Sequence, residues 1–577
     1  MSSNSNVVKN EKLDVIEILD NSKKARILFL IALGISGLGI RFYFFPYDVP
    51  LFNDAQGYFW YAIDMSILNQ MPPWYSIVNN GWPSFLSIIF QLIDSDNFLD
   101  YHNVQRFVGV LFSVATIMPV YVLCSRYFKK SYSLLGVALF AFEPKLIQNS
   151  FLGTPESMYV FLMASLLCLF LASNFKKIYL AFGIVALLSL TRFEGLLMII
   201  PVSLVFFIRF RKQKKDLMKF IICISIFILI LMPIAYLKND ISGQDGLISH
   251  ISAGPMYYQA TIQENSSTLV DYLYLGSSNL IKYVGWAQIP SFIIFIPLGL
   301  IFIFKGIDYK KITIIVSILV MLAPAFYGYS RELSEMKYLY VLYPTFCVLA
   351  CFSFKIFLEK IHRKNLIFSI IIGGIILSSI IFVQWKAIDD EHYRETYQIL
   401  TDIGQKEMKI NKEFGIYGGE FLFLHWVTVG EVEKFPFLRN ELPVSKITYP
   451  PHQHFFMRIT DTTESDVDEL VVLGKQWQVG DAKIKESTEY HNLEIDNLGD
   501  YFQVLEKQKI TYLILDKYND ARMISGELKN HLRDMFNHEG NYPFLIKEYD
   551  SKENGFNYHV KLFKIDYDLY NEWINEN

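Results

Sequence analysis

Residues 178–208 read IYLAFGIVALLSLTRFEGLLMIIPVSLVFFI. The stretch is mostly apolar, but Arg192 and Glu194 lie near its middle, in the segment Thr191-Arg192-Phe193-Glu194-Gly195. A membrane-crossing helix needs about 20 mostly apolar residues, so these 31 residues form either one long helix or two shorter helices that meet at this segment. The choice between the two arrangements fixes the membrane topology of the rest of the chain.

The distribution of Lys and Arg decides between one helix and two. Basic residues form six short clusters between apolar runs: Lys23/Lys24/Arg26, Arg126/Lys129/Lys130, Lys176/Lys177, Arg209/Arg211/Lys212/Lys214/Lys215, Lys305/Lys310/Lys311 and Lys355/Lys360/Arg363/Lys364. Such clusters favour the cytoplasmic ends of helices, and all six face the cytoplasm only if residues 178–208 form a hairpin. An Arg and a Glu in the middle of one lipid-exposed helix would also be unfavourable. We therefore predict a hairpin whose turn carries Arg192 and Glu194 to the opposite surface.

Further apolar runs extend on both sides of this hairpin. They are residues 27–44, 104–123, 158–171 with their flanks, 220–236, 286–304, 312–327, 338–354 and 366–384, and a run at 131–150 that bends at Glu143-Pro144. Together with the hairpin they predict about eleven crossings. A hydrophobic fraction of 52% with only 19% charged residues agrees with a chain that has the bilayer as its main solvent.

The same topology divides the chain into three parts. We predict a cytoplasmic N-terminal tail at 1–25, a transmembrane domain at 26–386 and an extracytoplasmic domain at 387–577, in a multi-pass protein of the cell membrane or an equivalent membrane. The first apolar run follows a polar stretch and is interpreted as a retained anchor. All five cysteines lie within apolar segments, which disfavours disulfides. A net charge of −4 without a basic face argues against nucleic acid as a partner.

Beyond residue 387 the pattern changes to short strands and amphipathic helices, which predicts a small α/β domain. We expect helices at 393–407 and 521–536, strands at 414–417 and 511–515, and a hairpin that pairs 544–548 with 560–565 across Asn554-Gly555. His452 and His454 could ligate a metal, but spacing identifies no third ligand, so an ordinary loop is the simpler interpretation. A divalent metal stays possible, and the cofactor is unknown.

Four polar motifs fall on the predicted outer face. The first outward loop contains Phe52-Asn53-Asp54-Ala55-Gln56-Gly57-Tyr58-Phe59, and the others are Thr154-Pro155-Glu156-Ser157-Met158-Tyr159, the hairpin turn, and Arg331 with Lys337-Tyr338 ahead of Tyr343-Pro344. In this order, over roughly residues 27–354, they resemble the polytopic GT-C glycosyltransferases, the superfamily of protein O-mannosyltransferases and bacterial aminoarabinose transferases. The chain lacks a Trp-Trp-Asp motif, and Ala rather than Glu follows Asp54.

The resemblance implies transfer of a sugar from a polyprenyl-phosphate donor to an acceptor hydroxyl of a glycan, lipid or protein on the extracytoplasmic face, next to membrane lipids. The catalytic aspartate of the family falls on Asp54, which would be the base of an inverting displacement, and Glu156 is a second catalytic candidate. The site predictions continue with Arg192, Arg331 and Lys337 for the donor phosphate and Tyr58, Glu194 and Tyr338 for substrate.

Each motif also has a structural interpretation. Asp54 can cap a helix, Arg192 and Glu194 can form an ion pair that closes the hairpin, and Glu156 can start a helix. Arg331 and Lys337 can be interfacial charges that reach toward water. Two other functions stay open, namely a transporter or flippase for a lipid-linked or anionic substrate and a non-catalytic GT-C-like assembly subunit.

Overall fold

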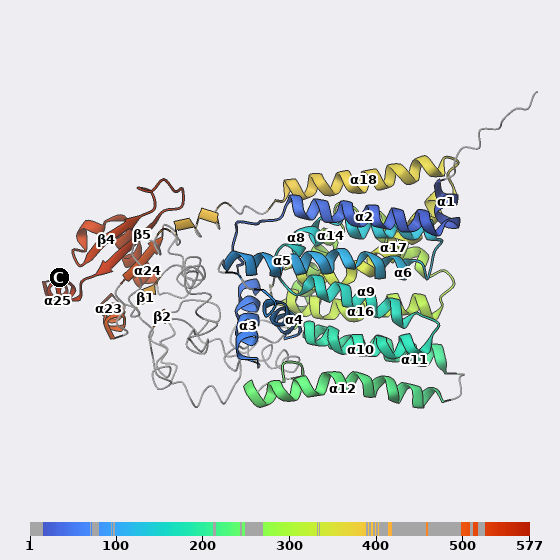
Figure 1. Ribbon diagram of the computed structural model, residues 1–577, viewed down its shortest axis with the longest axis horizontal. Helices are drawn as coiled ribbons and strands as arrows, with labels where there is room; N and C mark the ends of the chain where they lie inside the picture. Colours follow the sequence, from blue (N-terminus) through green and yellow to red (C-terminus); the bar gives the residue numbers. More distant parts are fainter. Residues whose placement is uncertain are drawn as a thin grey trace, which may run out of the picture. The chain divides into compact units, whose positions relative to one another are not determined.

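A computed structural model shows a helical assembly and a small mixed sheet (Figure 1). It describes residues 15–52, 54–69, 71, 80–93, 95, 98–211, 215–242, 245–248, 269–331, 333, 335–387, 391, 394–395, 398–399, 402, 414–417, 457–459, 498–507, 512–516 and 526–576. Two compact units are present. The first comprises Met1–Phe45, Arg106–Pro233 and His250–Ala387, and the second comprises Pro46–Gln105, Ile234–Ser249 and Ile388–Asn577. The predicted domain boundaries stay predictions.

The first unit is a helix bundle. Its helices are α1 (Val15–Asn21), α2 (Lys23–Tyr43), α6 (Ile117–Cys124), α7 (Lys130–Ala141), α8 (Pro144–Ser150), α9 (Glu156–Phe170), α10 (Phe175–Thr191), η1 (Phe193–Met198), α11 (Ile199–Phe210), α14 (Leu269–Ala287), α15 (Phe295–Ile303), α16 (Tyr309–Ser330), η2 (Met336–Leu342), α17 (Tyr343–Glu359) and α18 (Lys364–Trp385), with most of α5 (Phe98–Ala115) and α12 (Asp216–Ser242). Figure 1 shows the long helices of this unit running alongside one another.

Among the described residues, seven helical segments are long and apolar enough to cross a membrane. They are Lys23–Tyr43, Leu99–Cys124, Phe193–Phe210, Asp216–Ile241, Tyr309–Ser330, Met336–Glu359 and Lys364–Trp385. Shorter apolar helices at Lys130–Ala141 and Glu156–Phe170 coincide with two further predicted crossings. The chain is therefore a multi-pass membrane protein, as its composition predicted.

The hairpin predicted at residues 178–208 is confirmed. Helix α10 ends at Thr191, Arg192 is extended with φ −146°, and η1 leads into α11. The ring centroids of Phe175 and Phe210 lie 4.7 Å apart, so the start of α10 contacts the end of α11. The bend predicted at Glu143-Pro144 is also present, because Glu143 precedes the first residue of α8.

Close packing at the hairpin turn requires a glycine at position 195. A Cβ added at Gly195 would lie 2.7 Å from the backbone carbon and oxygen of Leu188 in α10. We expect Gly195→Ala to lower the free energy of unfolding by roughly 1–3 kcal/mol, because backbone atoms cannot move aside as a side chain can. Thermal unfolding of the purified protein tests this. Gly34→Ala in α2 is the control, since a Cβ there meets no atom within 4 Å, and an equal midpoint for both variants would contradict the prediction.

A buried arginine links three helices of the bundle. The Arg41 side chain, near the end of α2, is fully buried. Its Nη1 donates to the carbonyl oxygens of Gly37 and Ala141 at 2.9 and 3.0 Å, and its Nη2 donates to Ser113 Oγ at 2.8 Å. These bonds join α2 to α5 and α7 and supply polar partners for both terminal nitrogens, whereas the buried Nε makes no hydrogen bond to the described residues.

The second unit holds the loop that follows α2 and the C-terminal region. In the loop, α3 (Asp54–Leu68) packs on α4 (Gly81–Phe90), with the ring centroids of Phe59 and Phe90 5.7 Å apart. The C-terminal sheet has the order β2-β1-β3-β5-β4. Its elements are β1 (Phe414–Tyr417), β2 (Met457–Ile459), α23 (Leu498–Lys507), β3 (Tyr512–Asp516), α24 (Gly526–Asn537), β4 (Leu545–Asp550), β5 (Val560–Ile565) and α25 (Tyr567–Glu576).

The α/β prediction for this region is confirmed. Strands β1 and β3 lie where expected, and β4 pairs antiparallel with β5 across a turn in which Gly555 has φ +87°. Helix α24 overlaps the helix expected at 521–536. The strands and helices enclose a core that includes Phe502, Leu515, Phe544 and Phe563. Of the helix expected at 393–407, only scattered residues are described, and His452 and His454 lie outside the described residues.

Candidate functional site

The centre of the candidate site is an ion triad at the hairpin turn. Arg192 Nη1 donates to Glu156 Oε1, and its Nη2 and Nε donate to the two carboxylate oxygens of Glu194 at 2.8 and 3.3 Å. All three residues are buried, with exposed fractions of 6%, 3% and 5% for Arg192, Glu156 and Glu194. Glu156 is the first residue of α9, and Arg192 and Glu194 flank the start of η1. The ion pair that closes the hairpin therefore exists, and it includes a second carboxylate.

Two tyrosines cover this triad. The Arg192 guanidinium carbon lies 5.9 Å from the ring centroids of both Tyr159 and Tyr338. Tyr338 comes from η2, and its ring fits against Gly328 of α16, where an added Cβ would lie 3.2 Å from it. The buried hydroxyl of Tyr159 makes no hydrogen bond to any residue that the structure describes. Buried hydroxyls usually have a partner, so this one is a candidate contact for a polar ligand.

The triad has two carboxylates for one guanidinium. With both carboxylates ionised its net charge is −1, which on its own repels a phosphate and attracts a cation or a proton. A phosphate that binds Arg192 must therefore replace one carboxylate at the guanidinium or be accompanied by further positive charge.

Two further cations lie between the end of α16 and the first turn of η2. Lys337 Nζ lies 2.5 Å from Glu335 Oε2, and the Lys337 side chain is 25% exposed. Arg331, at the end of α16, is exposed, and its Nη1 donates to the Tyr327 hydroxyl at 3.3 Å. Lys337 directly precedes Tyr338, whose ring lies beside Arg192, so the two predicted site residues are neighbours in η2.

A second buried charged pair was not identified as a site from the sequence. Lys145 Nζ lies 3.8 Å from Glu143 Oε1 and donates to the carbonyl oxygen of Ile289, and its ammonium lies 4.7 Å from the Phe382 ring centroid. The Tyr343 hydroxyl lies 3.4 Å from Glu143 Oε1. The sequence marked Glu143 only as part of a bend, and it directly precedes α8; its tertiary partners lie on distant helices that no local pattern connects.

Asp54 and Tyr58 belong to the second unit. Asp54 is an exposed residue in the first turn of α3, and Tyr58 lies one turn later and is half-buried. The amide of Gln105 donates to the carbonyl oxygen of Ala55 at 2.9 Å, and Leu51 N donates to His102 Nδ1 at 2.8 Å. Residues on both sides of Asp54 are thus hydrogen-bonded to α5. These bonds hold the start of α3, which carries the Asp54 carboxylate.

The same unit contains a buried cation that sequence patterns did not single out. Lys238 at the end of α12 is 7% exposed, and its Nζ donates to Asn80 Oδ1 at 3.0 Å. A Cβ at Gly246 would lie 2.7 Å from this Nζ, so the following loop folds closely over it. Within the described ranges, no three His, Cys, Asp or Glu residues gather as a metal site would require.

Similarity to known proteins agrees with this architecture. The fold is similar to that of ArnT from Cupriavidus metallidurans bound to undecaprenyl phosphate, with a TM-score of 0.55 at 9% identity over 94% of this chain and 98% of that chain. It is also similar to the archaeal oligosaccharyltransferase AglB from Archaeoglobus fulgidus in complex with an inhibitory peptide and a dolichol-phosphate, with a TM-score of 0.52 at 12% identity over 92% of this chain and 74% of that chain. A search of curated proteins finds no match.

The chain therefore shares its fold with ArnT and with the archaeal oligosaccharyltransferase, which agrees with the GT-C resemblance of its sequence motifs. A family model described as dolichyl-phosphate-mannose-protein mannosyltransferase matches residues 84–236, about a quarter of the chain. The matched segment contains all three residues of the ion triad.

Proposed function

We propose that this chain transfers a sugar from a polyprenyl-phosphate donor to an acceptor hydroxyl on the extracytoplasmic face of the membrane. One observation carries the proposal: a chain with the GT-C fold presents an exposed carboxylate, Asp54, at an anchored helix start directly after its first spanning helix. The similar structures were solved with undecaprenyl phosphate and with a dolichol-phosphate, which supports a lipid-phosphate carrier here.

In the proposed reaction Asp54 takes the proton of the acceptor hydroxyl. The acceptor oxygen then forms a bond to the anomeric carbon as the bond between that carbon and the phosphate oxygen breaks, which inverts the configuration. The polyprenyl phosphate leaves with the bonding electrons and an additional negative charge. A base at the acceptor and cations at the departing phosphate are the two groups that lower this barrier.

Arg192, Arg331 and Lys337 are proposed to bind the donor phosphate, and Tyr58, Glu194 and Tyr338 are proposed to contact substrate. The triad suggests how these roles divide. Arg331 and Lys337 are accessible to an arriving phosphate, whereas Arg192 is held by Glu156 and Glu194. We infer that Glu156, the second predicted catalytic carboxylate, orients the guanidinium, and that Glu194 gives up its bonds when phosphate binds.

A donor panel tests the proposed function. The purified protein, reconstituted in vesicles, is offered polyprenyl phosphates that carry different sugars, and release of the free polyprenyl phosphate is followed. We expect one donor to be consumed faster than spontaneous hydrolysis, since the carrier and the sugar are both recognised. Transport of an intact donor across the bilayer without release would favour a flippase instead, and inertness toward every donor would favour an assembly subunit.

A further inference from the structure

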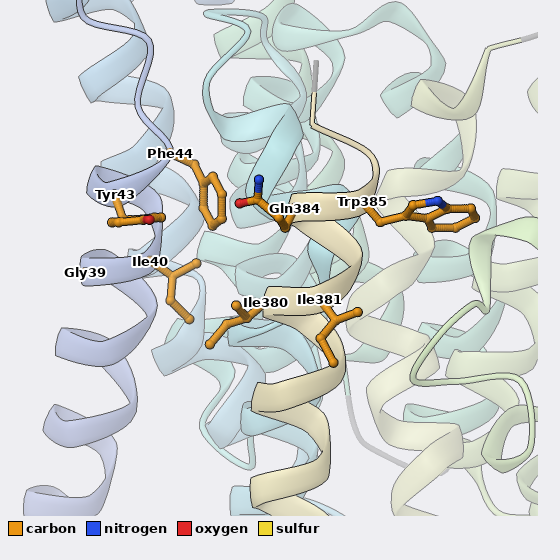
Figure 2. A pocket seen from close by; sticks show the side chains of 8 residues that line it. All are labelled: Gly39, Ile40, Tyr43, Phe44, Ile380, Ile381, Gln384 and Trp385. Carbon is orange, nitrogen blue, oxygen red and sulfur yellow. The ribbon is translucent and has the colours of Figure 1, made fainter. Parts of the chain in front are cut away.

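A groove runs between the ends of helices α2 and α18, away from the ion triad. Its volume is about 620 Å³, within the range of pockets that hold small organic ligands. Figure 2 shows Ile40 of α2, and Phe44 directly after α2, facing Ile380 and Gln384 of α18. At their other ends the two helices are in contact, with the ring centroids of Phe29 and Phe368 6.4 Å apart. The groove therefore lies at one end of this helix pair.

Both helices that form the groove face outward from the bundle. Only 17% of the apolar stretch of α2 and 28% of that of α18 are buried within the protein. The floor is a packed cluster in which Val383 of α18 meets residues of α2, α5 and α8. Since α2 and α18 are long and apolar enough to cross a membrane, the open side of the groove faces lipid chains.

Polarity changes along the groove in one direction. The isoleucines Ile380 and Ile381 come first, and Gln384 and Trp385 follow at the end of α18. Lys386, the next residue, does not line the groove itself but directly follows its last lining residue. On α2, Tyr43 lies at the same end and is 80% exposed, and Trp385 is 66% exposed. Exposed Tyr and Trp side chains are typical of the lipid headgroup level, where the apolar part of the ring contacts acyl chains and its polar group contacts water.

A cation lies at this polar end. Lys386 Nζ lies 4.3 Å from the Trp385 ring centroid, and the Lys386 carbonyl oxygen accepts a hydrogen bond from Gln148 of α8 at 2.5 Å. Toward the end of α18, apolar side chains are followed by aromatic rings and then by an ammonium group. This order matches the acyl chain, glycerol region and phosphate of a phospholipid. A neighbouring protein helix would not require that gradient, so the groove fits a lipid better than a helix.

We propose that this groove is a binding site for one anionic glycerophospholipid of the surrounding bilayer, with an acyl chain between α2 and α18 and the phosphate beside Lys386. The site is separate from sugar transfer and does not rest on the proposed function. Lys386 selects for the anionic headgroup because a basic residue near the membrane surface attracts acidic lipids.

Two glycines of α2 give a matched pair of variants. Gly39 lines the groove, and a Cβ there meets no atom within 4 Å, so Gly39→Phe fills the groove without a clash at the backbone. Gly34, on the same helix, also has no atom within 4 Å of an added Cβ but does not line the groove, so Gly34→Phe is the control. Lys386→Gln removes the cation and leaves the groove open.

The experiment counts lipids that stay bound to the full-length protein. The protein is reconstituted in phosphatidylcholine vesicles that contain phosphatidylglycerol, extracted in mild detergent and examined by native mass spectrometry. We expect the wild type and Gly34→Phe to retain one tightly bound phosphatidylglycerol and Gly39→Phe to lose it. Lys386→Gln should lower the preference for phosphatidylglycerol over phosphatidylcholine by about fivefold.

Four results would overturn the proposal. Gly39→Phe could retain the lipid as the wild type does, or both glycine variants could lose it equally, and either result would remove the groove as the site. A change from oligomer to monomer in Gly39→Phe alone would show that a second protein helix occupies the groove. Equal retention of neutral and anionic lipid in the wild type would contradict the selectivity assigned to Lys386.

Discussion

Replacing Asp54 by Asn is expected to reduce sugar transfer by about 10²–10⁴-fold, the contribution of a positioned general base. Asn keeps the shape and the hydrogen-bonding capacity of the side chain but cannot accept a proton at neutral pH. Asp54 is exposed, so the substitution should change the free energy of unfolding by no more than about 0.5 kcal/mol. Transfer from the consumed donor and thermal unfolding are measured on the same preparation.

The competing interpretation of Asp54 is a charge that favours the start of α3. A carboxylate in the first turn stabilises a helix through the positive end of its dipole. Asp100 is the control, because it too is an exposed carboxylate in the first turn of a helix, α5. We expect the Asp100→Asn variant to transfer sugar at the rate of the wild type. If both variants lost activity in parallel with stability, or if Asp54→Asn stayed fully active, the proposed base would be wrong.

The second large effect is expected from substitutions of Arg192, the cation of the ion triad. Arg192→Ala is expected to lower the free energy of unfolding by about 3–5 kcal/mol, because it leaves two buried carboxylates without their cation. Arg192→Lys keeps the charge but not the planar fork that binds Glu194 through two nitrogens, so the protein should fold and bind donor at least about tenfold more weakly. Donor titrations and thermal unfolding separate these two outcomes.

Glu194→Gln distinguishes a phosphate ligand from a purely structural arginine. If Glu194 must release Arg192 when phosphate binds, this variant removes a competing charge, and its donor affinity should equal or exceed that of the wild type. If the triad only closes the hairpin, all three substitutions should lower the unfolding temperature while donor affinity stays the same. Unchanged affinity in Arg192→Lys would refute the phosphate role of this residue.

The hairpin was predictable because its evidence is local and chemical. An apolar run of 31 residues has basic clusters at both ends and charged residues in its middle. Two helices joined by a turn place both clusters on one side of the bilayer and the central charges at the opposite surface, which one long helix cannot do. Strands β4 and β5 of the C-terminal region were also predictable from a local pattern, since they are short apolar segments that flank Asn554-Gly555.

The partners within the site were not predictable. Glu156 was predicted as a catalytic candidate, with a helix start as its structural interpretation, but its bond to Arg192 spans 36 positions and depends on how α9 packs against α10. Lys238 binds Asn80 across 158 positions, and neither residue belongs to a recognisable pattern. Periodicity reports which face of a helix is apolar, whereas the neighbour of each polar group is decided by packing between distant helices.

Arg41 has a consequence for the biogenesis of the protein. Besides the carbonyl oxygen of Gly37 on α2 itself, the groups that accept hydrogen bonds from its guanidinium lie on Ser113 and Ala141, 72 and 100 positions further along the chain. A ribosome completes α2 long before it makes α7, so the nascent first helix must keep this charge at the wet edge of the bilayer until those partners emerge. We therefore expect the final depth of the first helix to be set late in synthesis, by segments that insert after it.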